Sequence, residues 1–124
     1  MRKRTIALTA ASAALAGVVA MAPAASAEPN PPGCEKGYFC VYSGQNQTGT
    51  LVVKTFGDWS GSAGGRSTFN NGVAAPGADH IQLTYTYHGA TYERCLHFNP
   101  GPGDYKLNFD TGVVFKSAVW RGEC

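Results

Sequence analysis

The sequence predicts one small, single-domain, all-β protein that is stabilised by disulfides. Short runs of aromatic and β-branched residues recur along the chain, and each run has the length of a strand. Glycine- and proline-rich stretches separate the runs, and no segment shows a sustained helical period. Four cysteines are the third observation, because an even number in an exported chain predicts a disulfide framework. The predicted strands span residues 38–42, 50–56, 81–87, 94–98, 105–109 and 113–120.

Residues 1–27 have the pattern of a secretory signal peptide. Arg2, Lys3 and Arg4 form a basic start, an uncharged run follows from 5 to 20, and small residues precede Ala27. The uncharged run is rich in alanine and too short for a membrane span, which needs about 20 strongly apolar residues. We therefore expect cleavage after Ala27 and a secreted, extracellular protein with no membrane segment in its mature form.

The mature chain then begins with a proline-rich lead-in over residues 28–33, and the folded domain covers 34–124. Three of the ten Lys and Arg residues lie in the predicted signal, which leaves seven basic against eight acidic side chains. The basic surface expected of a nucleic-acid-binding protein is therefore missing. We predict that the mature protein binds neither nucleic acid nor an anionic membrane.

The four cysteines allow three disulfide connectivities. We favour Cys34 with Cys40, which lie in one short segment, and Cys95 with Cys124, which would join the C-terminus to an internal strand. A zinc site is disfavoured, because the spacings are not C-x-x-C and export favours oxidation.

The strand at 81–87 shows the clearest alternation. Ile81, Leu83, Tyr85 and Tyr87 would lie on one face, and polar residues on the other. Strands with one packed and one solvated face indicate an antiparallel sandwich or small barrel. A loose similarity between the two halves fits either two related four-stranded units or chance resemblance between β-rich segments. Turn-forming residues predict connections at 43–49, 57–65, 70–77 and 99–103.

The segment Cys34–Tyr42, followed by Gln45–Gly49, resembles the opening of a family of small exported actinobacterial peptidase inhibitors, the Streptomyces metalloproteinase inhibitor type. This resemblance implies a βγ-crystallin-like Greek-key sandwich, in which a tight hairpin over 42–49 is closed by a glycine. A glycine is needed there for a positive φ or a close backbone approach. Ser67 and Ser117 resemble the serine that each Greek key places beneath its hairpin.

The chain departs from the family pattern in two ways. Ala63-Gly64 and Val113-Val114 stand where calcium-binding relatives carry paired Asp or Asn, and calcium prefers several oxygen ligands. We therefore predict no metal site. The second half also lacks a short cysteine loop like the one that carries the reactive bond of the type member, so no reactive residue transfers.

Enzymatic motifs are missing from the sequence. Ser62 does not lie in a G-x-S-x-G elbow, and His80, His88 and His97 are spread over separate segments without H-E-x-x-H spacing. No spacing singles out a pair of carboxylates for glycoside hydrolysis. We predict no catalytic residue, no cofactor and no enzyme activity.

A protein inhibitor needs a rigid scaffold and an exposed loop. Two loops are candidates: residues 57–65, which contain Trp59, and residues 99–104, which are stiffened by Pro100 and Pro102 around Gly101. The sequence does not choose between them. We predict a monomeric inhibitor of extracellular proteases, with a metalloprotease favoured by the resemblance. The alternative is a non-inhibitory secreted β domain that binds a cell-surface polymer or serves a structural or stress role.

Overall fold

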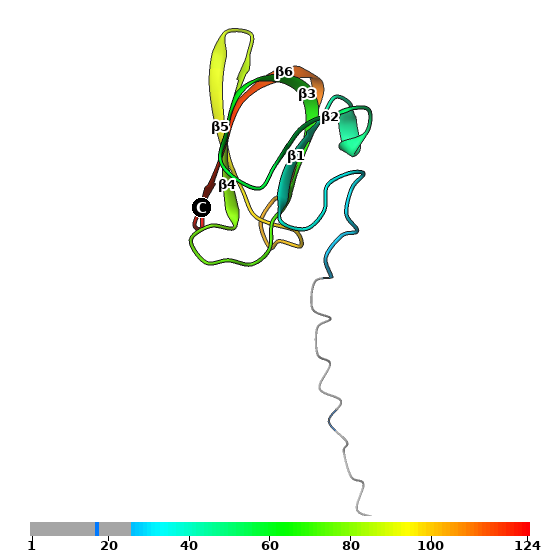
Figure 1. Cartoon of the computed structure of the whole chain (residues 1–124), viewed down its shortest axis with the longest axis vertical. Helices are drawn as coiled ribbons and strands as arrows, with labels where there is room; N and C mark the ends of the chain where they lie inside the picture. Colours follow the sequence, from blue (N-terminus) through cyan, green and yellow to red (C-terminus); the bar gives the residue numbers. More distant parts are fainter. Residues whose placement is uncertain (1–16, 18–25) are drawn as a thin grey trace, which may run out of the picture.

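The computed structural model describes residue 17 and residues 26–124, and nearly all of the predicted signal peptide lies outside these residues. The chain is all-β, as predicted, with one short 3-10 helix (Figure 1). The prediction of a strand at 38–42 is confirmed. The elements are β1 (Tyr38–Tyr42), η1 (Gln45–Gln47), β2 (Leu51–Thr55), β3 (Trp59–Asn71), β4 (His80–Tyr87), β5 (Ala90–Leu96) and β6 (Lys106–Arg121).

All six strands belong to one antiparallel sheet with the order β2-β1-β3-β6-β4-β5. Strands β3 and β6 are long, and they pair with each other in two separate stretches. Residues 67–69 of β3 pair with 106–108 of β6, whereas Trp59–Gly65 pair with Val113–Ala118. The two ends of the sheet therefore repeat one order, with β2-β1 beside the later part of β3 and β5-β4 beside the later part of β6.

The sequence-based assignment was wrong at β3, where residues 57–65 were predicted to form a turn. Glycine and serine have low strand propensity, but here the backbone pairs with β6 at residues 59–60 and 63–65. Gly65 is required by packing, because a Cβ atom would lie 2.8 Å from the carbonyl oxygen of Tyr42 and 3.1 Å from the Phe115 ring. The two strands predicted at 105–109 and 113–120 are one strand, and β5 begins four residues earlier than predicted.

Side chains from both ends of the sheet pack into one core. Ile81 and Leu83 are fully buried and Tyr85 and Tyr87 are half-buried against this core, which confirms the predicted face of β4. The burial of these side chains supplies the main stabilising free energy of the domain. The core comprises Phe39, Val41, Val53, Ile81, Leu83, Leu96, Val113, Phe115 and Ala118.

The hairpin between β1 and β2 folds over β3 and β6, and Ser67 lies beneath it, as the resemblance implied. The Ser67 Oγ donates to the carbonyl oxygen of Gly44 at 2.6 Å and accepts from the backbone N–H of Gln47 at 2.9 Å. Gly49 has φ +77°, and a Cβ atom there would lie 2.3 Å from Ser43 Oγ. The closing glycine is therefore required by both its backbone conformation and its close contact.

The second half has no such folded hairpin. Strands β4 and β5 are joined by a two-residue turn of His88 and Gly89, both with positive φ, and they project as a straight hairpin (Figure 1). Ser117 is half-buried, and its hydroxyl makes no hydrogen bond to any residue of the described chain. The βγ-crystallin-like Greek-key type remains a prediction within the all-β class.

Both predicted disulfides are present. Cys34 bonds to Cys40 with a Cα–Cα distance of 6.2 Å, and Cys95 bonds to Cys124 with a distance of 5.8 Å. The first fixes the start of β1, and the second joins β5 at the edge of the sheet to the C-terminus. Each closes a loop in the unfolded chain and so stabilises the fold by about 2–4 kcal/mol.

Candidate functional site

The loop between β5 and β6, residues 97–105, has a fixed base and an exposed tip. The backbone N–H of His97 donates to the carbonyl oxygen of Asp104 at 2.8 Å, which closes the base. Gly101 has φ +98°, a conformation that favours glycine. Pro102 and the two residues that follow it are exposed. This loop contains the predicted candidate residues 100–102, and it is a loop in the structure.

Asn99 anchors the inner side of this loop and is only 2% exposed. Its backbone N–H donates to the carbonyl oxygen of Asn70 at 3.1 Å. Its side chain makes a reciprocal pair with the backbone of Glu28, with both hydrogen bonds at 2.8 Å. The Lys36 ammonium donates to the Asn99 carbonyl oxygen at 3.3 Å. Three segments distant in sequence therefore hold the start of the loop, and Pro100 is half-buried next to them.

The Glu28 side chain adds a second attachment at the end of the loop. Its carboxylate accepts a hydrogen bond from the Tyr105 hydroxyl at 2.6 Å and two from the Lys106 ammonium at 2.9 Å. The hydrogen bond from Tyr105, followed by that from Lys106, lowers the pKa of Glu28. The same carboxylate raises the pKa of Tyr105 to about 12. The lead-in is thus a support for the loop.

A buried polar cluster lies where β4 begins, next to this loop. The Asp79 carboxylate interacts with His80 Nδ1 at 2.6 Å and accepts the backbone N–H of Ala75 at 2.9 Å. Burial by itself raises the pKa of Asp79, but the hydrogen bonds from His80 and Ala75 outweigh it, and the pKa is lowered. The rings of His80 and His97 meet edge to face with centroids 4.5 Å apart. The fold brings these two histidines together and leaves His88 at the hairpin turn.

Neither a metal centre nor a membrane helix is found in the part of the chain that the structure describes. No group of three or more His, Cys, Asp or Glu side chains in these residues could hold a metal ion. No helix among them is long and apolar enough to span a membrane.

Trp59, the candidate of the other predicted loop, does not lie in a loop. It is the first residue of β3, pairs with Ala118 of β6 and is half-buried against the core. Its ring covers Gly61, where a Cβ atom would lie 3.0 Å from the ring. Of the two candidate segments, the structure therefore presents only 99–104 as an exposed loop.

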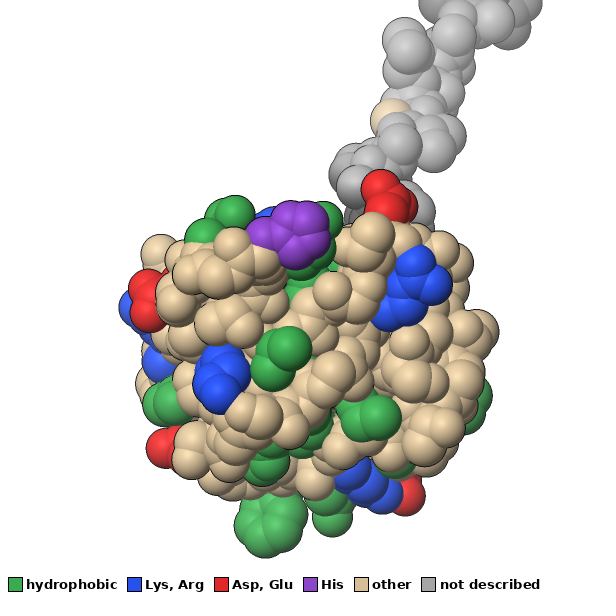
Figure 2. Space-filling model, turned by 90° about the horizontal axis from the view of Figure 1, so that it is seen from above, with side chains coloured by type: hydrophobic (Ala, Val, Ile, Leu, Met, Phe, Trp, Pro, Cys, Tyr) green, Lys and Arg blue, Asp and Glu red, His purple; other side chains and the backbone are tan. Residues whose placement is uncertain are grey.

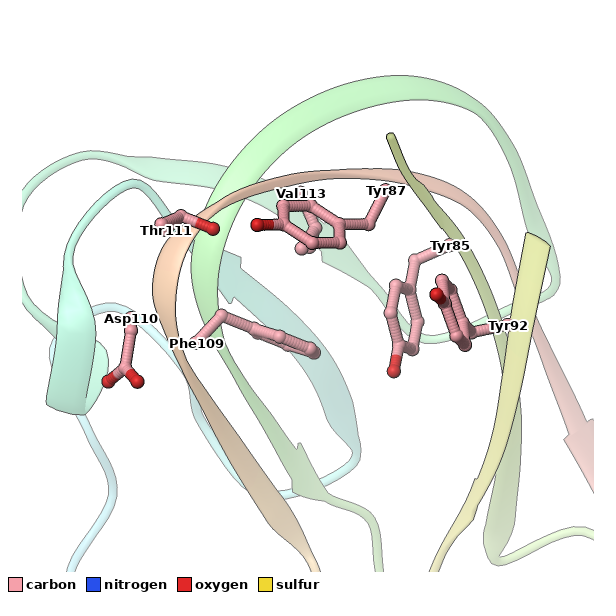
Figure 3. Close-up of a pocket in the computed structure, with 7 residues that line it drawn as sticks. All are labelled: Tyr85, Tyr87, Tyr92, Phe109, Asp110, Thr111 and Val113. Atoms are coloured by element: carbon pink, nitrogen blue, oxygen red, sulfur yellow. The ribbon is translucent and has the colours of Figure 1, made fainter. Parts of the chain in front are cut away.

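An aromatic groove of about 490 Å³ opens between the β4–β5 hairpin and the bend of β6 (Figure 3). Tyr85 and Tyr92 stack with ring centroids 5.4 Å apart, and Phe109 meets Tyr85 at 67° and 5.0 Å. In Figure 3 the rings of Tyr85, Tyr87 and Phe109 stand around the hollow, and Tyr92 lies outside Tyr85. The groove is lined by Tyr85, Tyr87, Tyr92, Phe109, Asp110, Thr111 and Val113.

Neither the Glu28 anchor nor this groove was predicted from the sequence. The only available signal for the groove was the alternation of tyrosines along 81–87, which indicates a shared face but not where the core ends. Glu28 carried no signal, because its partners lie more than 70 residues away.

Comparison with known proteins identifies a family. The sequence model of the family described as peptidase inhibitor family I36 matches residues 27–98, which span the lead-in and strands β1 to β5. No curated protein and no solved structure matches the chain. The matched segment ends immediately before Asn99, at the start of the exposed loop.

Proposed function

We propose that this chain, which belongs to peptidase inhibitor family I36, blocks an extracellular protease by inserting the loop at residues 99–104 into the protease cleft. Membership of the family makes the chain a protease inhibitor rather than an enzyme, and its partner a protease. The family match carries this conclusion. The choice of loop rests on the geometry of the segment between β5 and β6.

The support for this loop is its fixed base. Asn99 is held by Asn70, Glu28 and Lys36, and the N–H of His97 bonds to Asp104 across the base. Association costs less free energy when a loop is already ordered in its bound conformation. If a protease cut the loop at its tip, the two ends would remain attached at Asn99 and at Asp104. The cleaved loop would therefore stay in place in the protease cleft.

The scaffold fits an extracellular inhibitor. Both disulfides stabilise a domain with a small core, and all four cysteines are bonded. We propose that the mature protein starts at Glu28 and acts as a secreted monomer without a cofactor. A metalloprotease is the target that the family resemblance favours.

The test is a titration of the mature protein into three protease assays: a thermolysin-like metalloprotease, a subtilisin-like protease and papain. We expect stoichiometric inhibition of the metalloprotease. Inhibition of another protease class alone would correct the target, and inhibition of none would refute the proposed function.

Two variants test the loop itself. Replacing Pro100 and Pro102 together by alanine should weaken inhibition by about 30-fold, which corresponds to about 2 kcal/mol of binding free energy. Removing Glu28 alone, so that the chain begins at Pro29, should also weaken inhibition, because the reciprocal pair with Asn99 and the contacts to Tyr105 and Lys106 are lost.

Phe56→Ala is the matched control, since Phe56 is 76% exposed and lies outside the loop. This variant should inhibit as well as the parent. Trp59→Ala tests the other candidate. If Trp59→Ala abolishes inhibition in a folded protein while the proline variant retains it, the inhibitory segment is the start of β3. Circular dichroism must show that each variant is folded.

A further inference from the structure

The residues that line the aromatic groove carry polar groups without partners. The hydroxyls of Tyr85, Tyr87 and Tyr92 make no hydrogen bond to any described residue. The Asp110 carboxylate forms no ion pair within residues 26–124, and it accepts only one long hydrogen bond, from Gln45 Nε2 at 3.4 Å. A few polar groups among aromatic side chains in a hollow are typical of a ligand site.

The charge around the groove favours an uncharged ligand. Asp110 is the only acidic lining residue, and the guanidinium of Arg66 donates to its backbone carbonyl oxygen. One carboxylate, with the Arg66 guanidinium bonded to the backbone of the same residue, leaves little negative potential to attract a cation. Figure 2 likewise shows acidic and basic side chains scattered over one face of the molecule.

The shape of the groove fits a chain of sugar rings. A β-linked hexopyranose has apolar C–H faces that stack on aromatic rings, and hydroxyls around its edge that donate and accept hydrogen bonds. Phe109 and Tyr85 provide ring walls at 67° to each other, and Tyr87 adds a third. The volume of about 490 Å³ is within the usual range for ligand sites, about 300–1,000 Å³.

We propose that the groove between the β4–β5 hairpin and the bend of β6 binds an uncharged polysaccharide of β-linked hexopyranose units. Tyr87 and Phe109 contact the sugar faces, Tyr92 supports Tyr85, and Asp110 accepts hydrogen bonds from sugar hydroxyls. The site is separate from the proposed inhibitory loop. The groove uses the turn end of the β4–β5 hairpin, whereas the loop follows the opposite end of β5.

The experiment measures binding of the mature protein to cellohexaose and chitohexaose by calorimetry, with hexalysine as a cationic probe. We expect one of the two glycans to bind with an affinity that is unchanged between low and high sodium chloride, because the ligand is neutral. Binding of hexalysine alone, with a steep loss in salt, would overturn the proposal. Binding of none of the three probes would also overturn it.

Variants locate the site. Tyr92→Ala should weaken glycan binding by about tenfold or more, because the exposed ring that supports Tyr85 is lost. Asp110→Ala should weaken it severalfold, and Phe56→Ala, which removes an exposed aromatic ring outside the groove, should not change it. Glycan binding that Tyr92→Ala and Asp110→Ala leave intact would refute this site.

The same variants separate this proposal from the inhibitory function. Tyr92→Ala and Asp110→Ala should inhibit the protease like the parent protein, and the Pro100/Pro102 variant should bind glycan like the parent protein. Circular dichroism and thermal unfolding of each variant confirm that it is folded. Loss of inhibition by the groove variants would show that the groove belongs to the protease-binding surface, and this would overturn the separate glycan site.

Discussion

Replacing Ser67 by alanine should destabilise the domain far more than the same change at Ser117. Ser67 is fully buried, and its hydroxyl satisfies the N–H of Gln47 and the carbonyl oxygen of Gly44. Removing the hydroxyl leaves the N–H of the buried Gln47 without a partner, at a cost of about 1–3 kcal/mol. Gly44 is half-buried, so water can bind its carbonyl oxygen when the Ser67 hydroxyl is removed. Loss of this second hydrogen bond therefore adds less to the destabilisation. We expect a total of about 2–3 kcal/mol.

Ser117 is the matched control, because it holds the equivalent position in the second half of the sheet. Its hydroxyl makes no hydrogen bond to the described part of the chain, so Ser117→Ala should change stability by less than about 0.5 kcal/mol. For a domain of this size, about 2–3 kcal/mol lowers the melting temperature by about 10–20 °C. Thermal unfolding followed by circular dichroism, with disulfides intact, measures both variants. Equal melting temperatures would show that the hairpin is not fixed by Ser67.

Four further predictions follow from the contacts of Glu28, the disulfides and the missing calcium ligands. The lowered pKa of Glu28 means that its contribution to stability is present above pH 4.5 and is lost as pH falls through the folded pKa, so Glu28→Gln should flatten that acid limb of an unfolding curve. The raised pKa of Tyr105 has the opposite effect on the pH dependence of stability, because its contribution is lost as pH rises from about 10 to about 12. Glu28→Gln should return the pKa of Tyr105, measured by NMR titration, toward 10. Replacing Cys95 and Cys124 by serine opens the longer loop, with a sequence separation of 29, and should cost about 3–4 kcal/mol in denaturant unfolding, whereas the Cys34–Cys40 pair, with a separation of 6, should cost about 2–3 kcal/mol. Millimolar calcium should not raise the melting temperature, because Ala63, Gly64, Val113 and Val114 supply no side-chain oxygen; a rise of several degrees would contradict this.

The sequence was sufficient where local pattern and tertiary environment agree. The strand at 38–42, the alternating face of β4 and both disulfides were predicted, because each depends on residue type and spacing. The start of β3 was not predicted, since Trp59–Gly65 have the composition of a turn and become a strand only by pairing with Val113–Ala118. Tertiary context overrides local propensity more readily in strands than in helices.

The candidate site was predicted only in part, for a similar reason. Pro100 and Pro102 mark the loop by composition, but nothing local to Asn99 indicates that Glu28 and Lys36 hold it. Tyr85 and Tyr87 continue the buried face of Ile81 and Leu83, and from the sequence all four are core residues. Tyr85 and Tyr87 line a groove in the part of β4 beyond the register shift against β6 between Thr84 and Tyr85, and this shift depends on pairing that the local sequence does not show.

The difference between the two halves of the sheet explains where the exposed features lie. Both halves have the same pairing order, but the hairpin of the first half folds over β3 and β6 and is fixed by Ser67. The hairpin of the second half has a two-residue turn, so it cannot fold over, and Ser117 has no hairpin to bind.

Strands β4 and β5 therefore project beyond the core, which opens the tyrosine groove at the turn end. At the other end, β5 leads directly into the loop at 97–105. The first half supplies the lead-in residue Glu28 and Lys36 to hold that loop, so one half acts as the support and the other presents both proposed binding surfaces.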